Sequence, residues 1–374
     1  MSDEQRSSTE QASPETLRPE QDLKLGLFDI MQVDPVLQLE PNAMYAQRLD
    51  DLAFADDHGL DVAFAAERHF LHHHVIPSAT AWIASAAQRT TRMRLGMLGY
   101  TLPIRQPVQL AEEVAMVDQL SGGRVEVGFG LGHRVEELVA LGVDPESRVQ
   151  LFQQRVAMIQ ALWSGGKVSF QGGGVTAKEV AIWPLPHQEP HPPLWFAGTE
   201  PVAASWMGSR GFGFAVGFRP TEDLAGAVNA WRAGIRAQTD EVRQVAPPRN
   251  MGSLALMRHV YIAEDNDRAM REITDDLMKL NELAHGERAE GSRAERRAVA
   301  REHAEQMIAT DVMIAGGPDE VVAQIQASRE TLGFDLFLAN IYAAGVEQDR
   351  VRRTIRLLGS EIRQRLSEPV TSKA

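Results

Sequence analysis

The sequence MRLGMLGYTLPIRQPVQLAEEVAMVDQLSGGRVEVGFGLG, residues 93–132, contains a complete strand–helix–strand unit. Residues 93–100 are a short apolar run, which is typical of a buried strand. Residues 107–124 predict a helix that Pro107 opens and that Gly122-Gly123 closes, as is common at helix ends. Residues 124–132 predict a second strand that ends in glycines. A strand, a crossover helix and another strand indicate two parallel strands in one sheet.

The same alternation extends over most of the chain and predicts about eight strands. The further strands are expected at 24–30, 61–67, 193–198, 212–218, 253–264 and 334–340. Helices are expected between them, including 77–90, 146–163, 201–210, 223–238 and 318–333. Repeated strand–helix pairs in this number favour an α/β fold of the TIM (β/α)8 barrel type over an open sheet.

The domain organisation follows from the segments that break this alternation. Residues 1–22 are rich in Ser, Glu, Gln and Pro, so we expect a disordered tail before a single barrel domain at 23–368. Residues 165–192, with many glycines and prolines, predict a hairpin and loop insertion. Residues 281–306 are highly charged. This segment fits either a solvated helix or a mobile lid over the barrel mouth.

Composition excludes several classes of function. The 374 residues carry a formal net charge of −13 and include no cysteine. The acidic balance argues against a nucleic-acid partner, because phosphate binding needs clustered Lys and Arg. Without cysteine, disulfides, thiolate metal ligands and cysteine nucleophiles are excluded. No apolar run approaches the roughly 18 residues of a membrane helix, and no apolar signal-peptide core is present. We therefore expect a cytoplasmic protein without a membrane partner.

Common nucleotide-binding and hydrolytic motifs are missing from the sequence. GFGLG, 128–132, has GxGxG spacing instead of the GxGxxG of a dinucleotide-binding turn. Walker A, GxSxG and HExxH motifs are also absent. The sequence therefore shows no site of its own for a nicotinamide cofactor.

The stretch ERHFLHHHV, 67–75, places four histidines within six residues, directly after a predicted strand. A metal site needs three or four converging ligands, and the proline that follows disfavours a helix that would align them. We predict no metal site, and keep a metal-dependent hydrolase barrel as an alternative. His69 lies at the carboxyl end of a strand, where barrel enzymes have their active sites, and is a candidate functional residue. A solvated loop is predicted for His72, His73 and His74.

Several of these segments resemble the bacterial luciferase-like family of flavin-dependent monooxygenases. AERHF, 66–70, resembles the EHHF motif of that family. Residues 97–132 are similar to its longest motif, which runs from a small-residue pair through LP and DQLSGGR to a glycine-rich turn. PPLWFAGTEP, 192–201, and AGGPDEVVAQI, 315–325, resemble a later strand and a late helix start. These matches are collinear and span nearly all of the predicted domain.

The resemblance implies a TIM barrel with an insertion, a homodimer, and a monooxygenase that takes reduced FMN from a separate flavin reductase. In such enzymes the flavin reacts with dioxygen to a flavin peroxide, which oxygenates a small organic substrate. A deazaflavin-dependent dehydrogenase or reductase and a non-catalytic flavin-binding protein stay open as alternatives. An apolar substrate is favoured by aromatic and apolar residues near strand ends, although core packing explains each equally well: Phe28, Met31, Phe70, Tyr100, Trp195 and Phe218.

The resemblance also implies which residues contact the flavin. Leu98-Gly99 matches a small pair under the flavin ring, where the family often has a non-proline cis peptide bond. Gly130 and Gly132 match a turn that contacts the phosphate. Because Leu131 stands where many relatives have arginine, His133 or Arg134 would supply the positive charge. A second phosphate turn, which opens a helix whose amides suit an anion, is matched by Gly198-Thr199.

The catalytic assignment departs from luciferase at one position. Arg68 stands in place of the histidine that serves luciferase as an acid/base, and a guanidinium stays protonated at neutral pH. Arg68 would instead hold an anionic substrate or the flavin peroxide by charge. His69 matches the second histidine of the motif and is the nearest candidate for proton transfer. This substitution implies a non-luminous member of the family.

Overall fold

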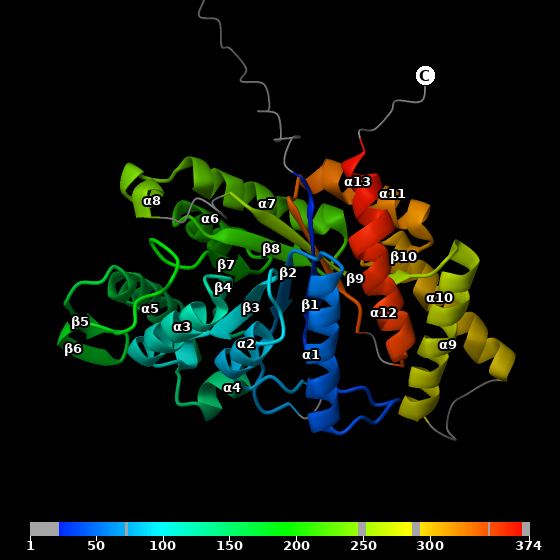
Figure 1. Cartoon of the computed structure of the whole chain (residues 1–374), viewed down its shortest axis with the longest axis horizontal. Coiled ribbons are helices and arrows are strands. Elements are labelled where there is room, and N and C mark those ends of the chain that lie inside the picture. Colours follow the sequence, from blue (N-terminus) through cyan, green and yellow to red (C-terminus); the bar gives the residue numbers. More distant parts are fainter. Residues whose placement is uncertain (1–21, 72–73, 246–251, 286–291, 343–344, 369–374) are drawn as a thin grey trace, which may run out of the picture.

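The computed structural model describes residues 22–71, 74–245, 252–285, 292–342 and 345–368 (Figure 1). Its centre is a closed barrel of eight parallel strands, as the sequence predicted. The barrel closes because β1 pairs with both β2 and β11, and β9 pairs with both β8 and β11. Its strands are β1 (Lys24–Asp29), β2 (Val62–Ala65), β3 (Arg94–Thr101), β4 (Val125–Gly130), β7 (Leu194–Ala197), β8 (Gly213–Gly217), β9 (Leu254–Ile262) and β11 (Leu336–Asn340).

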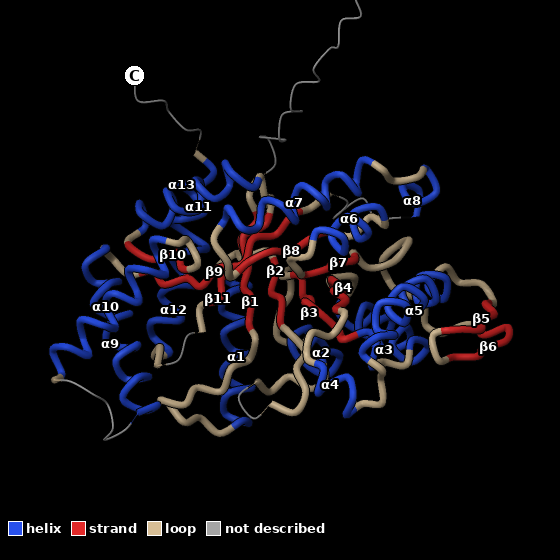
Figure 2. The backbone as a smooth tube through the Cα atoms, turned by 180° about the vertical axis from the view of Figure 1, so that it is seen from behind, coloured by secondary structure: helices blue, strands red, loops and turns tan. Residues whose placement is uncertain are grey.

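Helices surround the strands on the outside of the barrel (Figures 1 and 2). The longer ones are α1 (Pro41–Asp57), α2 (Ala79–Ala87), α3 (Pro107–Ser121), α5 (Arg148–Trp163), α6 (Pro201–Ser209), α7 (Thr221–Arg236), α9 (Asn266–His285), α10 (Arg293–Ala309), α11 (Pro318–Leu332) and α12 (Gln348–Leu357). The shorter ones are α4 (Val135–Ala140), α8 (Asp240–Val245) and α13 (Arg363–Ser367). None of the helices in the described ranges is long and apolar enough to cross a membrane.

Local sequence explains where the helices begin and end. A proline occupies the first turn of α1, α3, α6 and α11, where its missing N–H needs no helical partner. Gly122 ends α3 and Gly333 ends α11, each in the left-handed conformation that glycine adopts readily. These ends place each helix so that the chain returns to the start of the next parallel strand.

Side chains alternate between the two faces of each strand, which gives the barrel two apolar layers. The inward layer contains Phe28, Val62, Phe64, Leu98 and Trp195 among others. The larger outward layer packs between strands and helices. The strands that carry the barrel mouth are therefore packed on both of their faces.

Three segments differ from, or extend, the simple repeat. The antiparallel strands β5 (Val168–Gly172) and β6 (Val175–Val180) confirm the hairpin expected in the first insertion. The second insertion contains α10, whose only buried residues are Ala300 and Ala304. This exposure fits the solvated helix that was one of the two expectations for this segment. Residues 286–291 and the tail predicted for residues 1–21 lie outside the described residues. The short strand β10 (Met313–Gly316), which pairs with β9, was not predicted.

Candidate functional site

The segments predicted to form the site lie at the carboxyl ends of three neighbouring strands. β2 pairs with β3, and β3 pairs with β4, so residues 66–70, 98–105 and 130–137 share one sector of the barrel mouth. Hydrogen bonds and ion pairs join the three segments, as described below. The structure thus brings together Arg68, His69, Leu98-Gly99 and the glycine turn with His133.

Glu67 is the buried centre of this sector. Its side chain is 0% exposed, and its Oε1 accepts a hydrogen bond from the Thr101 backbone N–H at 3.1 Å. The same Oε1 lies 3.4 Å from His69 Nε2, and Oε2 lies 3.7 Å from Arg105 Nη1. A buried carboxylate is stable only with such partners, so Glu67 connects the loops that follow β2 and β3.

His69 is held by its backbone as well as by its ring. Its N–H donates to Glu137 Oε1 at 2.7 Å, and its carbonyl accepts from Arg134 at 3.3 Å. The side chain is 15% exposed. The interaction with the Glu67 carboxylate raises the pKa of His69 above its usual value, against the opposing effect of burial. The carboxylate therefore stabilises the imidazolium form, with Nε2 directed at Glu67.

Two arginines lie beside the glycine turn after β4. Arg68 and Arg134 lie near each other, and the carboxylates of Glu137 and Glu67 lie near Arg68. Burial, together with the charges of Arg68 and Arg134, lowers the pKa of His133. His133 is therefore mainly neutral at pH 7, and of the two predicted alternatives Arg134 is the better permanent cation.

Different structural constraints explain why glycine occupies the positions predicted for the site. The Leu98–Gly99 peptide bond is cis, as the resemblance implied for this position. A Cβ on Gly99 would lie 2.6 Å from the carbonyl oxygen of Gly128, so β3 and β4 approach closely here. Gly132 has a φ of 74°, which favours glycine in the turn. Contact of these residues with a flavin stays a prediction.

The second predicted phosphate turn lies at the end of β7, the strand next to β4. Gly198 N–H donates to the Ala215 carbonyl at 3.2 Å, and Thr199 is half-buried. Pro201 occupies the first turn of α6 and contributes no N–H. This helix start therefore offers one backbone N–H fewer to an anion than a start without proline.

Aromatic side chains line part of the barrel mouth. The rings of Phe28 and Phe218 are 5.8 Å apart, and the Phe218 ring is 4.8 Å from that of His259, which sequence reasoning missed. The other predicted residues lie elsewhere. Met31 and Tyr100 belong to the outward core, Trp195 lies deeper in the barrel, and Phe70 is exposed. Of the six predicted residues, Phe28 and Phe218 therefore remain as candidates to line an apolar side of the barrel mouth.

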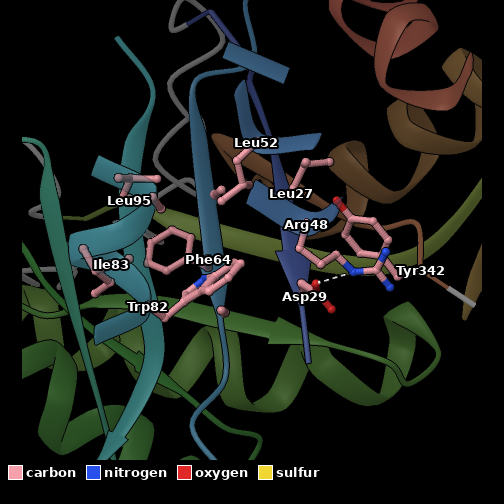
Figure 3. A pocket seen from close by; sticks show the side chains of 13 residues that line it. Leu27, Asp29, Arg48, Leu52, Phe64, Trp82, Ile83, Leu95 and Tyr342 are labelled. Carbon is pink, nitrogen blue, oxygen red and sulfur yellow. Dashed lines mark ion pairs between the residues drawn. The ribbon is translucent and has the colours of Figure 1, made fainter. Parts of the chain in front are cut away.

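A small cavity behind β1 is a separate feature (Figure 3). It measures about 20 Å³ and lies beside Asp29, Arg48 and Tyr342. Arg48 forms an ion pair with Asp29 at 3.1 Å and stacks over the Tyr342 ring at 3.6 Å. This volume suits about one water molecule, so the cavity is not a flavin or substrate site.

The histidine run does not form a metal centre within the described residues, which contain no group of three potential His, Asp or Glu ligands. His72 and His73 lie outside the described ranges. His74 differs from the solvated loop that was predicted. Its ring nitrogen lies 3.2 Å from the Ile30 carbonyl, and its backbone forms a bridge with Gln32.

Comparison with known proteins defines the class to which this barrel and site belong. A family model described as luciferase-like monooxygenase matches residues 23–336. The chain therefore belongs to the luciferase-like monooxygenase family. This membership and its enzymatic relatives favour an enzyme over the non-catalytic alternative considered for the sequence.

Curated relatives have two kinds of activity. The oxygenase component of the flavin-dependent trigonelline monooxygenase of Acinetobacter baylyi is 26% identical over 234 residues, which cover 60% of this chain and 61% of that protein. The F420-dependent glucose-6-phosphate dehydrogenase of Mycolicibacterium gilvum is 26% identical over 326 residues, 83% of this chain and 91% of that protein. An uncharacterized protein of Sinorhizobium fredii, y4wF, is 35% identical over 192 residues, 50% and 54% of the two chains. The chain thus matches less than two thirds of the Acinetobacter and Sinorhizobium proteins.

Solved structures share the fold. The monooxygenase RslO1 of Streptomyces bottropensis has a TM-score of 0.76 at 23% identity, over 92% of this chain and 99% of that one. The oxygenating constituent of 3,6-diketocamphane monooxygenase of Pseudomonas putida, in complex with FMN, has a TM-score of 0.75 at 17% identity, over 93% and 100%. These similarities establish the luciferase-like TIM barrel.

Proposed function

We propose that this enzyme is a monooxygenase that uses reduced FMN, supplied by a separate reductase, and dioxygen to oxygenate a small apolar organic substrate. The observation that carries the proposal is the pairing of a turn flanked by two arginines with an aromatic wall at one mouth. Arg68 and Arg134 provide the charge, and Phe28 and Phe218 provide the apolar surface. FMN has the matching chemistry, since it combines one phosphate with a planar aromatic ring.

The residues present fit this cofactor. Guanidinium groups form strong charge-assisted hydrogen bonds with phosphate, so Arg68 and Arg134 would hold that end of FMN. Gly99, Gly130 and Gly132 carry no side chains, which would let a flat ring approach the backbone at these positions. When bound, reduced FMN would supply the electrons that activate dioxygen.

The Glu67–His69 pair would donate or accept a proton at this mouth. Because Nε2 of His69 faces Glu67, Nδ1 is the ring atom that would exchange a proton with a bound molecule. Its raised pKa suits a group that donates a proton near neutral pH. Arg68 stays charged and would bind anionic groups, as its chemistry requires.

A partner reductase is part of the proposal. The Acinetobacter relative is named as an oxygenase component, which supports a two-component arrangement. The absence of a GxGxxG dinucleotide turn from the sequence agrees with an enzyme that receives its reduced flavin from another protein.

A deazaflavin-dependent dehydrogenase is the second candidate. It is favoured by the F420-dependent glucose-6-phosphate dehydrogenases, which match this chain at 26–28% identity. Such an enzyme would transfer hydride and would need neither dioxygen nor a reductase. The same mouth would then bind a deazaflavin in place of FMN.

Anaerobic titration of the purified protein with reduced FMN, oxidised FMN and F420 distinguishes the two candidates. The proposal predicts that reduced FMN binds at least about tenfold more tightly than F420, a difference of roughly 1.4 kcal/mol. On admission of air, reduced FMN on the enzyme should be consumed together with dioxygen. Tighter binding of F420, with no dioxygen uptake by the loaded enzyme, would assign the protein to hydride transfer.

A further inference from the structure

The hairpin of β5 and β6, which the proposed function does not use, lies beside α5 (Figures 1 and 2). Arg155 of α5 reaches the turn of this hairpin, where its Nε and Nη2 donate to the Gly173 carbonyl at 3.1 and 3.0 Å. Gly173 has a φ of 62°, a conformation that glycine adopts readily. One edge of the Arg155 guanidinium is therefore attached to the insertion that interrupts the barrel repeat.

The same guanidinium also holds the segment that follows β3. Nη1 of Arg155 donates to the carbonyl oxygens of Pro103 and Arg105, both at 2.7 Å. It also lies 3.2 Å from the carbonyl oxygen of Leu102. These carbonyls belong to a short 3-10 turn, Leu102–Ile104, and to the residue that ends it. The last carbonyls of a helical turn lack partners within the turn, so a donor from another element satisfies them.

Arg155 is unusual because backbone carbonyls take the place of a carboxylate. Its side chain is half-buried, and burial lowers its pKa without a carboxylate from the described part of the chain to counteract this effect. A cation in such surroundings is stable only when its N–H groups are hydrogen-bonded. The rigid fork of the guanidinium meets this need by donating to two separate backbone segments.

The segment that Arg155 holds carries Arg105 into the candidate site. Nη1 of Arg105 lies 3.7 Å from Oε2 of Glu67, and its Nη2 lies 2.9 Å from Oε2 of Glu113. The positive charge of Arg105 lowers the pKa of His69, against the raising effect of Glu67. The position of Arg105 therefore affects how strongly Glu67 stabilises the imidazolium of His69.

We propose that Arg155 is a positioning residue for the site at the barrel mouth. By attaching the Arg105 backbone to the hairpin turn, it keeps the Arg105 guanidinium beside Glu67 and so fixes the charge near His69. Arg155 acts through Arg105, since it is not itself among the groups that shift His69. The inference deepens the proposed function and rests on it only for the exchange of a proton between His69 and a bound molecule.

NMR titration of the His69 ring in the flavin-free full chain tests the inference. Arg105→Gln removes the nearby positive charge and should raise the pKa of His69. Arg155→Gln should shift this pKa in the same direction, because Arg105 is no longer held beside Glu67. Arg155→Lys should give an intermediate value, since an ammonium lacks the fork that joins the two segments. Arg148→Gln, in the first turn of the same helix, is the matched control and should leave the pKa unchanged.

The double variant Arg105→Gln/Arg155→Gln separates positioning from a general loosening of the fold. Its His69 pKa should equal that of Arg105→Gln alone, because the effect of Arg155 passes through Arg105. A further rise in the double variant, or an unchanged His69 pKa in Arg155→Gln, would overturn the proposal. If Arg155→Gln does not fold, a wild-type His69 pKa in Arg155→Lys would overturn it equally. No flavin is present, so either result leaves the test of FMN binding independent.

Discussion

Among single residues, Glu67 determines the geometry of the mouth, because it contacts groups from the segments that follow β2 and β3. It accepts the Thr101 N–H, faces the His69 ring and lies near Arg105. The contact with His69 stabilises the imidazolium. Its contribution to stability is therefore fully present below the usual histidine pKa of about 6.5 and is lost as pH rises through the raised value.

Replacement of Glu67 by Gln should lower the pKa of His69, because the opposite charge is removed. NMR titration of the histidine rings, with His69→Asn to identify the signal, measures this change. Glu113→Gln is the matched control, since Glu113 binds Arg105 at 2.9 Å and is not among the groups that shift His69. An unchanged His69 pKa in Glu67→Gln would refute the assigned pairing.

The buried carboxyl of Asp51 should make the free energy of unfolding decrease as pH rises. Burial raises its pKa from 3.8 to about 6, although Arg48, Gln348 and Arg352 lower it in part. The folded state therefore prefers protonated Asp51, and this contribution, at most about 3 kcal/mol, disappears as pH rises from about 4 through about 6. Asp51→Asn should flatten the dependence of the unfolding free energy between about pH 4 and about pH 7.

Urea denaturation at these two pH values provides the measurement. Asp50→Asn is the control, because Asp50 is half exposed and pairs with Arg89 at the surface. If wild type and Asp51→Asn lost stability equally with rising pH, Asp51 would not be the titrating group.

The sequence identified part of the candidate site at this scale. Arg68 and His69 were found because they follow a strand that ends at the barrel mouth. The roles of Glu137 and Arg105 could not be predicted, since these residues come from other loops and no local periodicity marks them. Glu137, for example, accepts a hydrogen bond from the N–H of His69, which is 68 positions away in the sequence. Their contribution depends on how the barrel closes.

At the scale of elements, the close approach of β3 and β4 shapes the mouth. A Cβ on Gly128 would lie 2.0 Å from the Met97 carbonyl oxygen, which is backbone and has little freedom to move. The nearest atom to a Cβ on Gly130, the Tyr100 carbonyl oxygen, would be at 3.7 Å. The two glycines of one strand therefore have different steric requirements.

We expect Gly128→Ala to destabilise the fold by about 1–3 kcal/mol, as overpacked interiors do, and Gly130→Ala to change stability by less than about 1 kcal/mol. Chemical denaturation of both variants compares them directly. Equal stabilities for the two variants would show that β3 and β4 are not packed as closely as described.

Element prediction succeeded where strands and helices were long and bounded by proline or glycine. α3, between Pro107 and Gly122, was predicted almost completely. β10 was missed because four residues are too few to show a period, and it is a strand only through its pairing with β9. Its formation depends on a contact that no local pattern encodes.

For the whole molecule, the homodimer implied by the resemblance stays a prediction with a candidate surface. Met116 and Leu120 lie four residues apart on α3 and are 51% and 50% exposed. Trp183 is 85% exposed in the loop whose Leu185 carbonyl accepts a hydrogen bond from Gln119 of α3. Apolar side chains gathered on one surface commonly mark a protein interface.

Leu120→Glu should therefore shift the protein from dimer to monomer, because a charge would be buried without a partner. Light scattering coupled to size-exclusion chromatography gives the mass. Val202→Glu is the control, since Val202 is 86% exposed on α6. A wild-type monomer, or a dimer that Leu120→Glu leaves intact, would contradict this surface.

We propose that the turn after β4 holds the phosphate of reduced FMN at the mouth. The most direct measurement compares anaerobic binding of reduced FMN and reduced riboflavin, which lacks the phosphate, by wild type and by Arg134→Ala. We expect the wild type to bind FMN at least about tenfold more tightly than riboflavin, and this difference should largely disappear in the variant. Equal affinity of the wild type for both flavins, or an undiminished difference in Arg134→Ala, would contradict it.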